Sequence, residues 1–310
     1  RLHRRSFSFS PPSPIPVTSP TILLFGGTGQ LGRILTSTLA DVGTLAVPDR
    51  SDADFTRPES LRTVVREAQP WMIVNAAAYT DVDGAESDEE PAHLVNAVAP
   101  GVLADEAGRA GAGIVHYSTD YVFDGRADRP YTEESQTAPA SVYGRTKLEG
   151  EQRVQSASAP SWILRTSWLY SPTGKNFLRT MLRLGREREQ VQVVDDQFGC
   201  PTSALWLAEA THNILRTAAQ SDRLEDTAGL YHAVSRGQTS WYGFARAIFR
   251  VFGVDVEVEA VDTDAFSRPA PRPAYSVLDS SKLTQTFGLR PPSWSRQLAD
   301  IREPLLQAEP

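Results

Sequence analysis

Short apolar runs alternate with longer segments of helical periodicity from Thr21 to about residue 170, and this alternation constrains the fold most strongly. Helical patterns occupy the intervals near 58–68, 91–110 and 140–155. The apolar runs that indicate buried strands are ILLF (22–25), LAV (45–47), MIV (72–74), IVHY (114–117) and WILR (162–165). Strand–helix repetition at a spacing of roughly 30 residues is typical of a parallel sheet with helices on both faces. The sequence therefore predicts an α/β fold built on a doubly wound parallel sheet.

The pattern loosens after Trp168, which indicates a second and smaller α/β unit. The proline-rich stretch 262–276 predicts a loop. The remaining predicted elements of this unit are helices at about 176–189, 203–218, 240–252 and 294–307 and short strands near 191–194, 230–234 and 256–259.

The first twenty residues differ in composition from the rest, because they are rich in serine and proline and contain arginine but no acid. Such a segment is expected to be disordered. A transit peptide, a cloning remnant and a start site placed too far upstream all remain open as its origin. We therefore predict three parts: a disordered tail over 1–20, a Rossmann-type nucleotide-binding domain over 21–170, and a substrate-binding domain over 171–310. Whether the chain crosses back between the two domains stays open.

Charge and cysteine content exclude several classes of function. The whole chain has 31 Lys and Arg against 38 Asp and Glu, and three of the arginines precede residue 21, so residues 21–310 carry 28 − 38 = −10. Such a surface repels a phosphate backbone, so we expect no nucleic-acid partner. The single cysteine, Cys200, and five scattered histidines predict neither a disulfide nor a metal site. Without an apolar run near the ~20 residues that span a bilayer, we expect a soluble, cytoplasmic protein.

A glycine-rich turn follows the first predicted strand and opens a helix. Gly26, Gly29 and Gly32 have the spacing GxxGxxG, with Gln30 and Leu31 between the last two. Glycines at this place allow a tight turn, a close approach of the backbone to a pyrophosphate, and close helix–strand packing. The helix N-terminus favours the anion. These five residues are therefore candidates to bind a dinucleotide.

The end of the second predicted strand bears on which dinucleotide is bound. Asp49 is placed to bond the adenosine ribose hydroxyls, which favours NADH. The adjacent Arg50 is placed to pair with the additional phosphate of NADPH. Asp54 and Phe55 follow closely and are candidates to border the adenine. The sequence leaves NADPH and NADH both open as the cofactor.

Tyr143 and Lys147 form a YxxxK pair on a predicted helix, and a spacing of four places both side chains on one face. A free tyrosine has a pKa of ~10, so an ammonium group nearby is expected to lower that pKa and make the phenol a usable acid–base group. Ser118-Thr119-Asp120 follows the strand IVHY, at the sheet edge where parallel sheets place their chemistry. The Thr119 hydroxyl is a candidate to bond a substrate carbonyl beside the tyrosine.

Small residues follow another predicted strand at the same edge. Asn75, Ala76 and Ala77 come directly after MIV, and their size lets a cofactor lie close to the backbone. The glycine turn, NAAA, STD and YxxxK thus occur in order, each at the expected end of a strand or helix.

These residues resemble those of the extended short-chain dehydrogenase/reductase family, and within it the dTDP-4-dehydrorhamnose reductases. The resemblance covers almost everything but the tail. It is carried by LLFGGTGQLG (23–32), VNAAAYTDVDGAES (74–87), VHYSTDYVFDG (115–125), VYGRTKLEGE (142–151), RTSWLY (165–170), NFLRTMLRL (176–184) and DDQFGCPT (195–202).

The resemblance implies reduction of the C4 ketone of dTDP-4-dehydro-β-L-rhamnose by hydride from NADPH or NADH. It implies that Tyr143 gives the proton, that Lys147 holds the nicotinamide ribose and lowers the tyrosine pKa, and that Thr119 orients the carbonyl. The residues that it places at the sugar nucleotide are Asp120, Tyr121, Trp168, Gln197 and Arg272.

Position 121 separates the chain from the related 4,6-dehydratases. Those enzymes carry an Asp-Glu pair after the threonine, whereas Asp120 is followed by Tyr121, so dehydration is disfavoured. A 4-ketoreductase for another deoxysugar nucleotide stays open. So does a non-catalytic binding subunit similar to the regulatory subunit of methionine adenosyltransferase.

Two departures from the family pattern affect other expectations. Some similar reductases bind magnesium through glutamates at a dimer interface, but Ile34 stands at one such position while Glu187 occupies another. An aliphatic side chain cannot ligate Mg²⁺, so both the metal and a homodimer of that kind are in doubt. The family's RPxNS is Arg-Pro-Ala-Tyr-Ser here, and Tyr275 makes the expected contact of Arg272 with the diphosphate less secure.

Overall fold

The computed structural model describes residues 20–221 and 223–308. Its centre is a six-stranded parallel sheet with the strand order β10-β5-β4-β3-β1-β2, which confirms the predicted fold class. The strands of this sheet are β1 (Thr21–Phe25), β2 (Thr44–Ala46), β3 (Met72–Asn75), β4 (Gly113–Thr119), β5 (Ser161–Thr166) and β10 (Gly229–His232).

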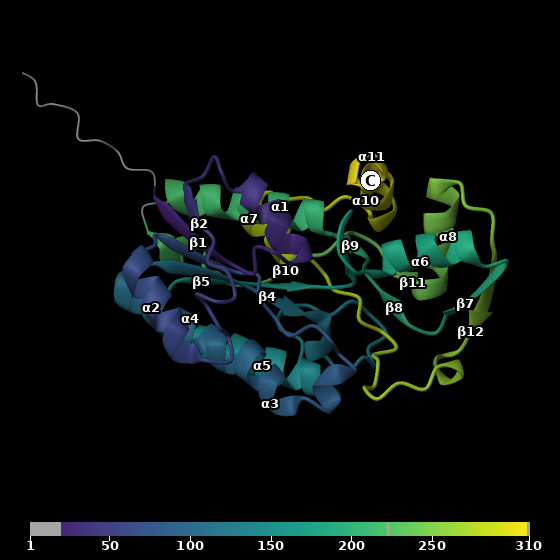
Figure 1. The fold of residues 1–310 in the computed structure, drawn as a ribbon, viewed down its shortest axis with the longest axis horizontal. Coiled ribbons are helices and arrows are strands. Elements are labelled where there is room, and N and C mark those ends of the chain that lie inside the picture. The colour runs from purple at the N-terminus through teal and green to yellow at the C-terminus, as the bar shows by residue number, and fades with distance from the viewer. Residues whose placement is uncertain (1–19, 222, 309–310) are drawn as a thin grey trace, which may run out of the picture.

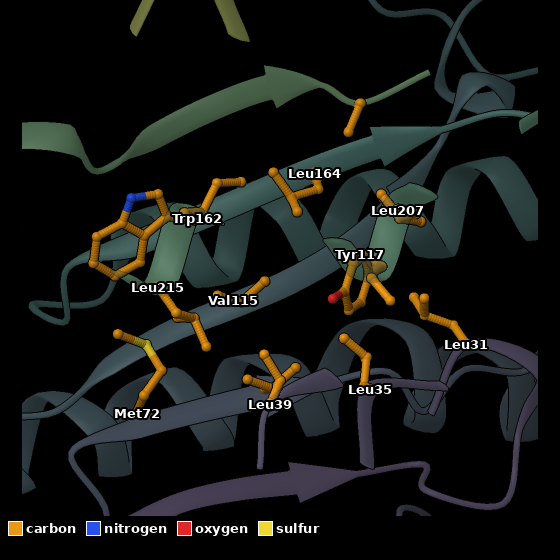
Figure 2. Close-up of a cluster of buried hydrophobic side chains, with 14 of the residues drawn as sticks. Leu31, Leu35, Leu39, Met72, Val115, Tyr117, Trp162, Leu164, Leu207 and Leu215 are labelled. Atoms are coloured by element: carbon orange, nitrogen blue, oxygen red, sulfur yellow. The ribbon is translucent and has the colours of Figure 1, made fainter. Parts of the chain in front are cut away.

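Helices cover both faces of this sheet (Figure 1). One face carries α1 (Gln30–Thr38) and α7 (Ala204–Gln220), and the other carries α2 (Pro58–Ala68), α4 (Ala99–Ala110) and α5 (Val142–Ser156). Successive strand residues point to opposite faces, so a sheet covered twice needs apolar residues at both. In β4, Val115 belongs to the core under α1 and α7, whereas Ile114 belongs to the core under α2 and α4. Figure 2 shows the first of these cores, in which Tyr117 and Leu164 lie beside leucines of α1 and α7.

A second core lies beyond the carboxyl ends of the sheet strands, among helices and a pair of short parallel strands. Its main apolar side chains include Leu178, Phe244, Ile248 and Leu298. The elements of this part are β6 (Leu169–Tyr170), α6 (Phe177–Glu187), β7 (Gln190–Val194), β8 (Phe198–Gly199), β9 (Thr202–Ser203), β11 (Thr239–Ser240), α8 (Trp241–Phe252), β12 (Glu257–Val261), α10 (Trp294–Asp300) and α11 (Arg302–Ala308). Helix α9 (Ser281–Phe287) packs instead on β10 and α7 of the first sheet, where Leu283 belongs to the core under α1 and α7.

The chain returns to the first sheet after leaving it. Helix α7 packs on α1, and β10 pairs in parallel with β5, with His232 opposite Arg165. The division at residue 170 stays a prediction, and the disordered tail lies outside the described residues except for Pro20. Among residues 20–221 and 223–308, no helix is both long and apolar enough to cross a membrane.

Prolines account for two differences from the predicted helices. The prediction of one continuous helix over 294–307 is wrong, because α10 ends at Asp300 and α11 begins at Arg302. Pro304 has no N–H to donate to the carbonyl four residues earlier, so it starts a new helix more readily than it continues one. The predicted helix 91–110 is present without a gap, but it is not α-helical throughout: α3 (Glu89–His93) runs into a π-helix over Leu94–Val98, and α4 follows with Pro100 in its first turn.

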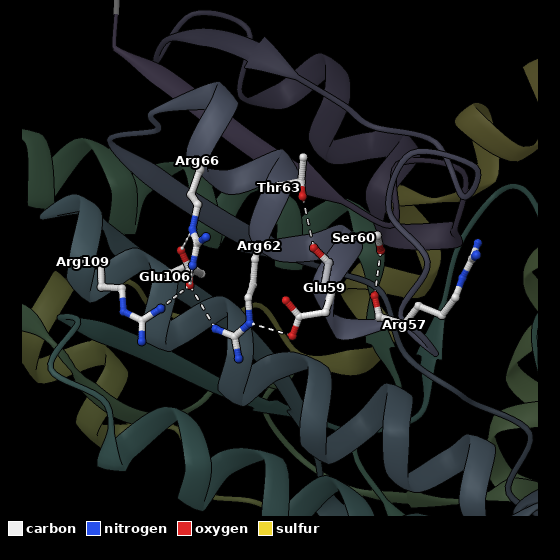
Figure 3. Close-up of polar contacts among 8 residues, drawn as sticks. All are labelled: Arg57, Glu59, Ser60, Arg62, Thr63, Arg66, Glu106 and Arg109. Atoms are coloured by element: carbon white, nitrogen blue, oxygen red, sulfur yellow. Dashed lines mark hydrogen bonds and ion pairs between the residues drawn. The ribbon is translucent and has the colours of Figure 1, made fainter.

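One buried carboxylate ties α2 to α4 (Figure 3). Glu106 on α4 is 2% exposed and accepts from Arg62, Arg66 and Arg109 at 2.5–3.0 Å. Hydrogen bonds from these guanidinium groups, led by that of Arg66, lower the pKa of Glu106 to about 2. This ion cluster lies on the face of the sheet that α5 also covers.

Candidate active site

The turn between β1 and α1 requires glycine at positions 26 and 32. Gly26 has φ +79°, and a Cβ on it would lie 2.6 Å from the carbonyl carbon of Ala76 and the amide nitrogen of Ala77. A Cβ on Gly32 would lie 2.0 Å from the Gly26 carbonyl oxygen. The Gly29 N–H donates to that same oxygen at 2.9 Å. The absence of side chains lets α1 pack directly on the turn and leaves the turn open on its outer side.

A cavity of about 510 Å³ opens on the outer side of the turn. It brings together eight of the predicted cofactor residues, from the ends of β1, β2 and β3: Gly26, Gly29, Asp49, Arg50, Asp54, Phe55, Ala76 and Ala77. Tyr79 and Val95 also line it. A narrow cavity over a glycine turn at a helix N-terminus fits the pyrophosphate and adenosine of a dinucleotide. The residues present therefore fit the cofactor that the sequence predicts.

The two aspartates that line this cavity, Asp49 and Asp54, accept hydrogen bonds from residues of their own turns. One oxygen of Asp49 accepts from Ser51 N at 2.7 Å and from the Ser51 hydroxyl at 2.5 Å, which lowers the pKa of Asp49. Asp54 accepts from the backbone and hydroxyl of Thr56, and these bonds lower the pKa of Asp54 to about 2. Both carboxylates are therefore ionised, and Asp49 offers its second oxygen to a ligand. Arg50 lies beside Asp49 on the cavity wall.

Four predicted cofactor residues lie next to this cavity without lining it. Gly32 sits behind the turn, and the Leu31 side chain is 6% exposed in the core, so only its backbone faces a ligand. The side-chain oxygen Oε1 of Gln30 accepts from Asn176 at 2.9 Å and from Ser171 at 3.1 Å, which ties α1 to the loop before α6. The side-chain oxygen Oδ1 of Asn75 accepts from the Ala77 N–H at 3.2 Å and supports the turn after β3.

The three predicted catalytic residues lie on β4 and α5. Thr119 is the last residue of β4, while Tyr143 and Lys147 are one turn apart on α5. The Ser141 hydroxyl caps α5 by accepting from Gly144 N at 3.1 Å, which fixes where the helix begins. A Cβ on Gly144 would lie 2.3 Å from the Tyr121 carbonyl oxygen, so this glycine lets α5 approach the end of β4 closely. Tyr143 also packs in one small cluster with Tyr79 of the cavity wall.

The effect of Lys147 on Tyr143 differs from the expectation. Burial raises the pKa of Tyr143 to about 12, and hydrogen bonding by Thr119 offsets only part of the rise. The Lys147 ammonium donates to the Tyr117 carbonyl oxygen at 2.6 Å, and burial lowers the pKa of Lys147 to about 8. The predicted lowering of the tyrosine pKa is therefore wrong for this structure, because burial disfavours the phenolate and the Lys147 ammonium donates to the Tyr117 carbonyl rather than to the phenol.

Asp120 and Tyr121 follow Thr119 in a short 3-10 helix over Asp120–Val122. Asp120 is 2% exposed and accepts from Ser167 at 2.9 Å and from Thr119 at 3.1 Å. Burial raises the pKa of Asp120 to about 6. The ring of Tyr121 meets that of Tyr143 edge-on, with centroids 5.6 Å apart. Tyr121 is thus in direct contact with Tyr143, whereas the Asp120 carboxyl group is hydrogen-bonded to Ser167 and Thr119 in the interior.

The other predicted sugar-site residues come from distant segments. Trp168 has φ +47°, a conformation rarely adopted by a bulky residue, and it stacks on Trp241 with centroids 3.5 Å apart. Gly199 makes this placement possible, since a Cβ there would lie 2.5 Å from the Trp168 ring. Trp241 is a contact that the sequence did not indicate, because a tryptophan that opens a helix has the pattern of an ordinary core aromatic.

Gln197 and Arg272 each form a polar contact with a residue of another loop. The Gln197 amide donates to the Thr263 hydroxyl at 2.9 Å. Arg272 is an internal partner rather than a solvated side chain: it is 13% exposed and pairs with Asp83 at 2.8 Å. Neither residue lines the cavity over the glycine turn. Asp83 was not singled out from the sequence, although it lies in the stretch VNAAAYTDVDGAES, which carries part of the resemblance.

Within the described part of the chain, no group of three or more His, Cys, Asp or Glu side chains is arranged to hold a metal ion. Glu187 instead pairs with Arg183 at 2.6 Å, one turn earlier on α6.

A doubly wound parallel sheet, a glycine turn under a dinucleotide-sized cavity, and a tyrosine flanked by the buried Thr119 and Lys147 together define an oxidoreductase of the extended short-chain dehydrogenase/reductase class. Residues 20–306 match the family model described as the RmlD substrate binding domain, and the chain belongs to that family.

Its relatives agree with this assignment. The dTDP-4-dehydrorhamnose reductase of Escherichia coli K12 is 46% identical over 283 residues, which cover 88% of this chain and 94% of that protein. A probable dTDP-4,6-dihydroxy-2-methyloxan-3-one 4-ketoreductase of Streptomyces antibioticus is 41% identical over 93% of this chain and 96% of its own length. The dTDP-4-dehydrorhamnose reductase of Bacillus anthracis, solved in complex with NADP, superposes with a TM-score of 0.86 at 35% identity and covers 92% of this chain and 99% of its own.

Proposed function

We propose that this protein reduces the C4 ketone of dTDP-4-dehydro-β-L-rhamnose to give dTDP-L-rhamnose, with NADPH or NADH as the cofactor. The observation that carries the proposal is the set of Thr119, Tyr143 and Lys147 at the end of β4, in a chain whose relatives are named as reductases of this sugar nucleotide.

The chain's own groups supply the proton chemistry. A bound nicotinamide supplies hydride to the carbonyl carbon, and negative charge then develops on the oxygen. With its pKa raised to about 12, Tyr143 is a protonated phenol at neutral pH. A simple alkoxide is more basic than a phenolate, so Tyr143 gives its proton to the developing alkoxide. The Thr119 hydroxyl, next to both Tyr143 and Asp120, orients the carbonyl beside the phenol.

Lys147 supplies a buried positive charge one helical turn from Tyr143. Its Nζ carries two protons besides the one that bonds the Tyr117 carbonyl, so it can donate to ribose hydroxyls of the cofactor. The Trp168 ring, fixed by Trp241 and Gly199, offers a flat apolar surface for the face of the hexose.

The test is a steady-state assay of the purified protein with dTDP-4-dehydro-β-L-rhamnose, followed by loss of absorbance at the nicotinamide band. We expect Tyr143→Phe to lower kcat by about 10²–10⁴-fold while NADPH affinity stays within twofold, because only the proton donor is lost. Tyr231→Phe is the matched control, since that phenol bonds the Thr227 carbonyl on the far side of the sheet. Full activity of Tyr143→Phe would overturn the assigned proton donor.

A second candidate is the reduction of another dTDP-4-keto-deoxysugar, favoured by the 41% identity to the Streptomyces antibioticus ketoreductase. The same assay with the alternative keto-sugar separates the two by the ratio of kcat/KM values. Cofactor binding with no consumption of either sugar would instead support a binding subunit.

The cofactor preference rests on Asp49 and Arg50. Both residues line the cavity, but one oxygen of Asp49 is engaged by its own turn, whereas Arg50 adds a positive charge there that suits the additional phosphate of NADPH, so we infer that NADPH is preferred. Arg50→Ala is expected to lower kcat/KM for NADPH about 5–10-fold and to leave that for NADH nearly unchanged, since a single ion pair with a phosphate contributes about 1 kcal/mol. An equal loss with both cofactors would contradict this assignment. A cytoplasmic location, a role in polysaccharide biosynthesis and a homodimer remain predictions.

A further inference from the structure

A buried polar contact links β3, β4 and α5 directly behind the catalytic helix. Asn75 and His116 are opposite each other in the pairing of β3 with β4, and Lys147 of α5 lies over them. The exposed fractions are 1% for Asn75, 0% for His116 and 2% for Lys147. Polar groups buried this deeply cost free energy unless they are hydrogen-bonded, so their partners determine which protonation states are stable.

The hydrogen bonds of Asn75 determine which imidazole nitrogen carries the proton. The side-chain oxygen Oδ1 of Asn75 already accepts from Ala77 N, so the Nδ2 amide group of the same side chain faces His116 Nδ1 at 3.2 Å. Burial lowers the pKa of His116 well below its usual value, so the ring is neutral and has one acceptor nitrogen and one N–H. Because Nδ1 accepts from Asn75, the proton is on Nε2.

The Nε2–H group faces Lys147. The distance from His116 Nε2 to Lys147 Nζ is 3.5 Å, whereas Nζ to the Tyr117 carbonyl oxygen is 2.6 Å. An ammonium group and an N–H are both donors, so they cannot bond each other, and the longer distance agrees with that. A neutral amine has a lone pair and can accept a hydrogen bond from the imidazole Nε2–H. This geometry therefore favours loss of a proton from Lys147.

We propose that His116 is a positioning residue that, through its Nε2–H, shifts the protonation equilibrium of Lys147 toward the neutral amine. This inference rests on one part of the proposed function, the binding of the cofactor ribose by Lys147. On α5, Tyr143 lies one turn before Lys147 and Glu151 one turn after it, and Glu151 is paired with Arg165 of β5. Burial lowers the pKa of Lys147 and the charge of Glu151 raises it, and the proposed effect of His116 adds to that of burial.

The test measures NADPH affinity by fluorescence between pH 7 and pH 9 without any sugar, so that its outcome does not depend on turnover. With the pKa of Lys147 at about 8, affinity of the native chain is expected to fall about tenfold across this range. In His116→Gln, the new amide oxygen can accept from the ammonium, and the fall is expected to shrink to about twofold. His93→Gln is the control, because His93 bonds Glu149 on the outer side of α5 at 3.1 Å, and it is expected to match the native profile.

An unchanged profile in a folded His116→Gln protein would overturn the inference. Nitrogen-15 NMR of the native chain provides a second test that needs no variant, with the ring signals assigned through the His116 backbone. We expect a neutral imidazole with its proton on Nε2 from pH 6 to pH 9. A proton on Nδ1, or an imidazolium, would refute the proposal whether or not the variant folds. If the protein consumes no keto-sugar but NADPH affinity still depends on pH as described, the result would count against the proposed function and not against the role of His116.

Discussion

The buried ion pair between Glu151 on α5 and Arg165 on β5 offers the sharpest test of how the catalytic helix is held. The two side chains are 1% and 4% exposed, and they meet through two hydrogen bonds of 2.9 and 2.7 Å. Glu151→Gln keeps the shape of the side chain but removes its charge. The guanidinium then remains buried without its counter-charge, at a place where water cannot easily reach it.

Removal of one partner from a buried pair costs about 3–5 kcal/mol, because the other charge stays desolvated. For about 290 ordered residues the unfolding entropy is about 0.6 kcal/mol per degree, so we expect the unfolding midpoint to fall by about 5–8 °C. Calorimetry or circular dichroism at pH 7 measures this shift. A change below 1 °C would refute the idea that this pair is desolvated.

Two further variants separate the pair from general effects of charge. Asp300→Asn breaks an exposed pair with Arg296, whose side chains are 72% and 51% exposed, and is expected to cost less than about 1 kcal/mol. The double change Glu151→Leu with Arg165→Met removes both charges and is expected to recover most of the lost stability. A double variant as unstable as the single one would show that packing, not charge, explains the loss.

Three other variants test separate parts of the structure. Gly32→Ala places a Cβ 2.0 Å from the Gly26 carbonyl oxygen, so the turn must shift and NADPH binding measured by calorimetry should weaken by at least 10²-fold. Glu106→Gln should cost about 1–2 kcal/mol at pH 7, less than the full pKa shift implies because two of its arginines are over half exposed. Since the folded-state pKa of Glu106 is depressed from 4.5 to about 2, the stabilisation is complete above pH 4.5 and is lost as pH falls toward 2. Trp241→Leu removes the support of Trp168 and should raise KM for the sugar about 5–10-fold with little change in NADPH affinity.

Each of these predictions has a contrary outcome. Normal NADPH affinity in Gly32→Ala would mean that the turn is not the pyrophosphate site. An equal loss of stability in Glu106→Gln at pH 3 and pH 7 would rule out an ionic origin. A change in NADPH affinity equal to that in sugar KM would show that Trp241 acts on the whole fold.

The local pattern of residues was enough to predict the central sheet. Apolar runs with helices between them describe β1, β3, β4 and β5 closely, because a strand covered on both faces must be apolar at nearly every position. The glycine turn was also predictable, since its constraint is the missing Cβ itself. The short helix α9 was not predicted, because its seven residues carry one fully buried apolar side chain, Leu283, and therefore little periodicity.

The sequence by itself determined the fold class and the order of the glycine turn, the small residues after β3, the threonine and the YxxxK pair, because these depend on spacing along the chain. Only the tertiary structure decided what surrounds those groups. It placed His116 against Lys147, Asp83 against Arg272 and Trp241 against Trp168, and it raised the pKa of Tyr143 where spacing had predicted a decrease. Burial and contacts between distant segments set those properties, and neither is a function of the spacing of residues in the chain.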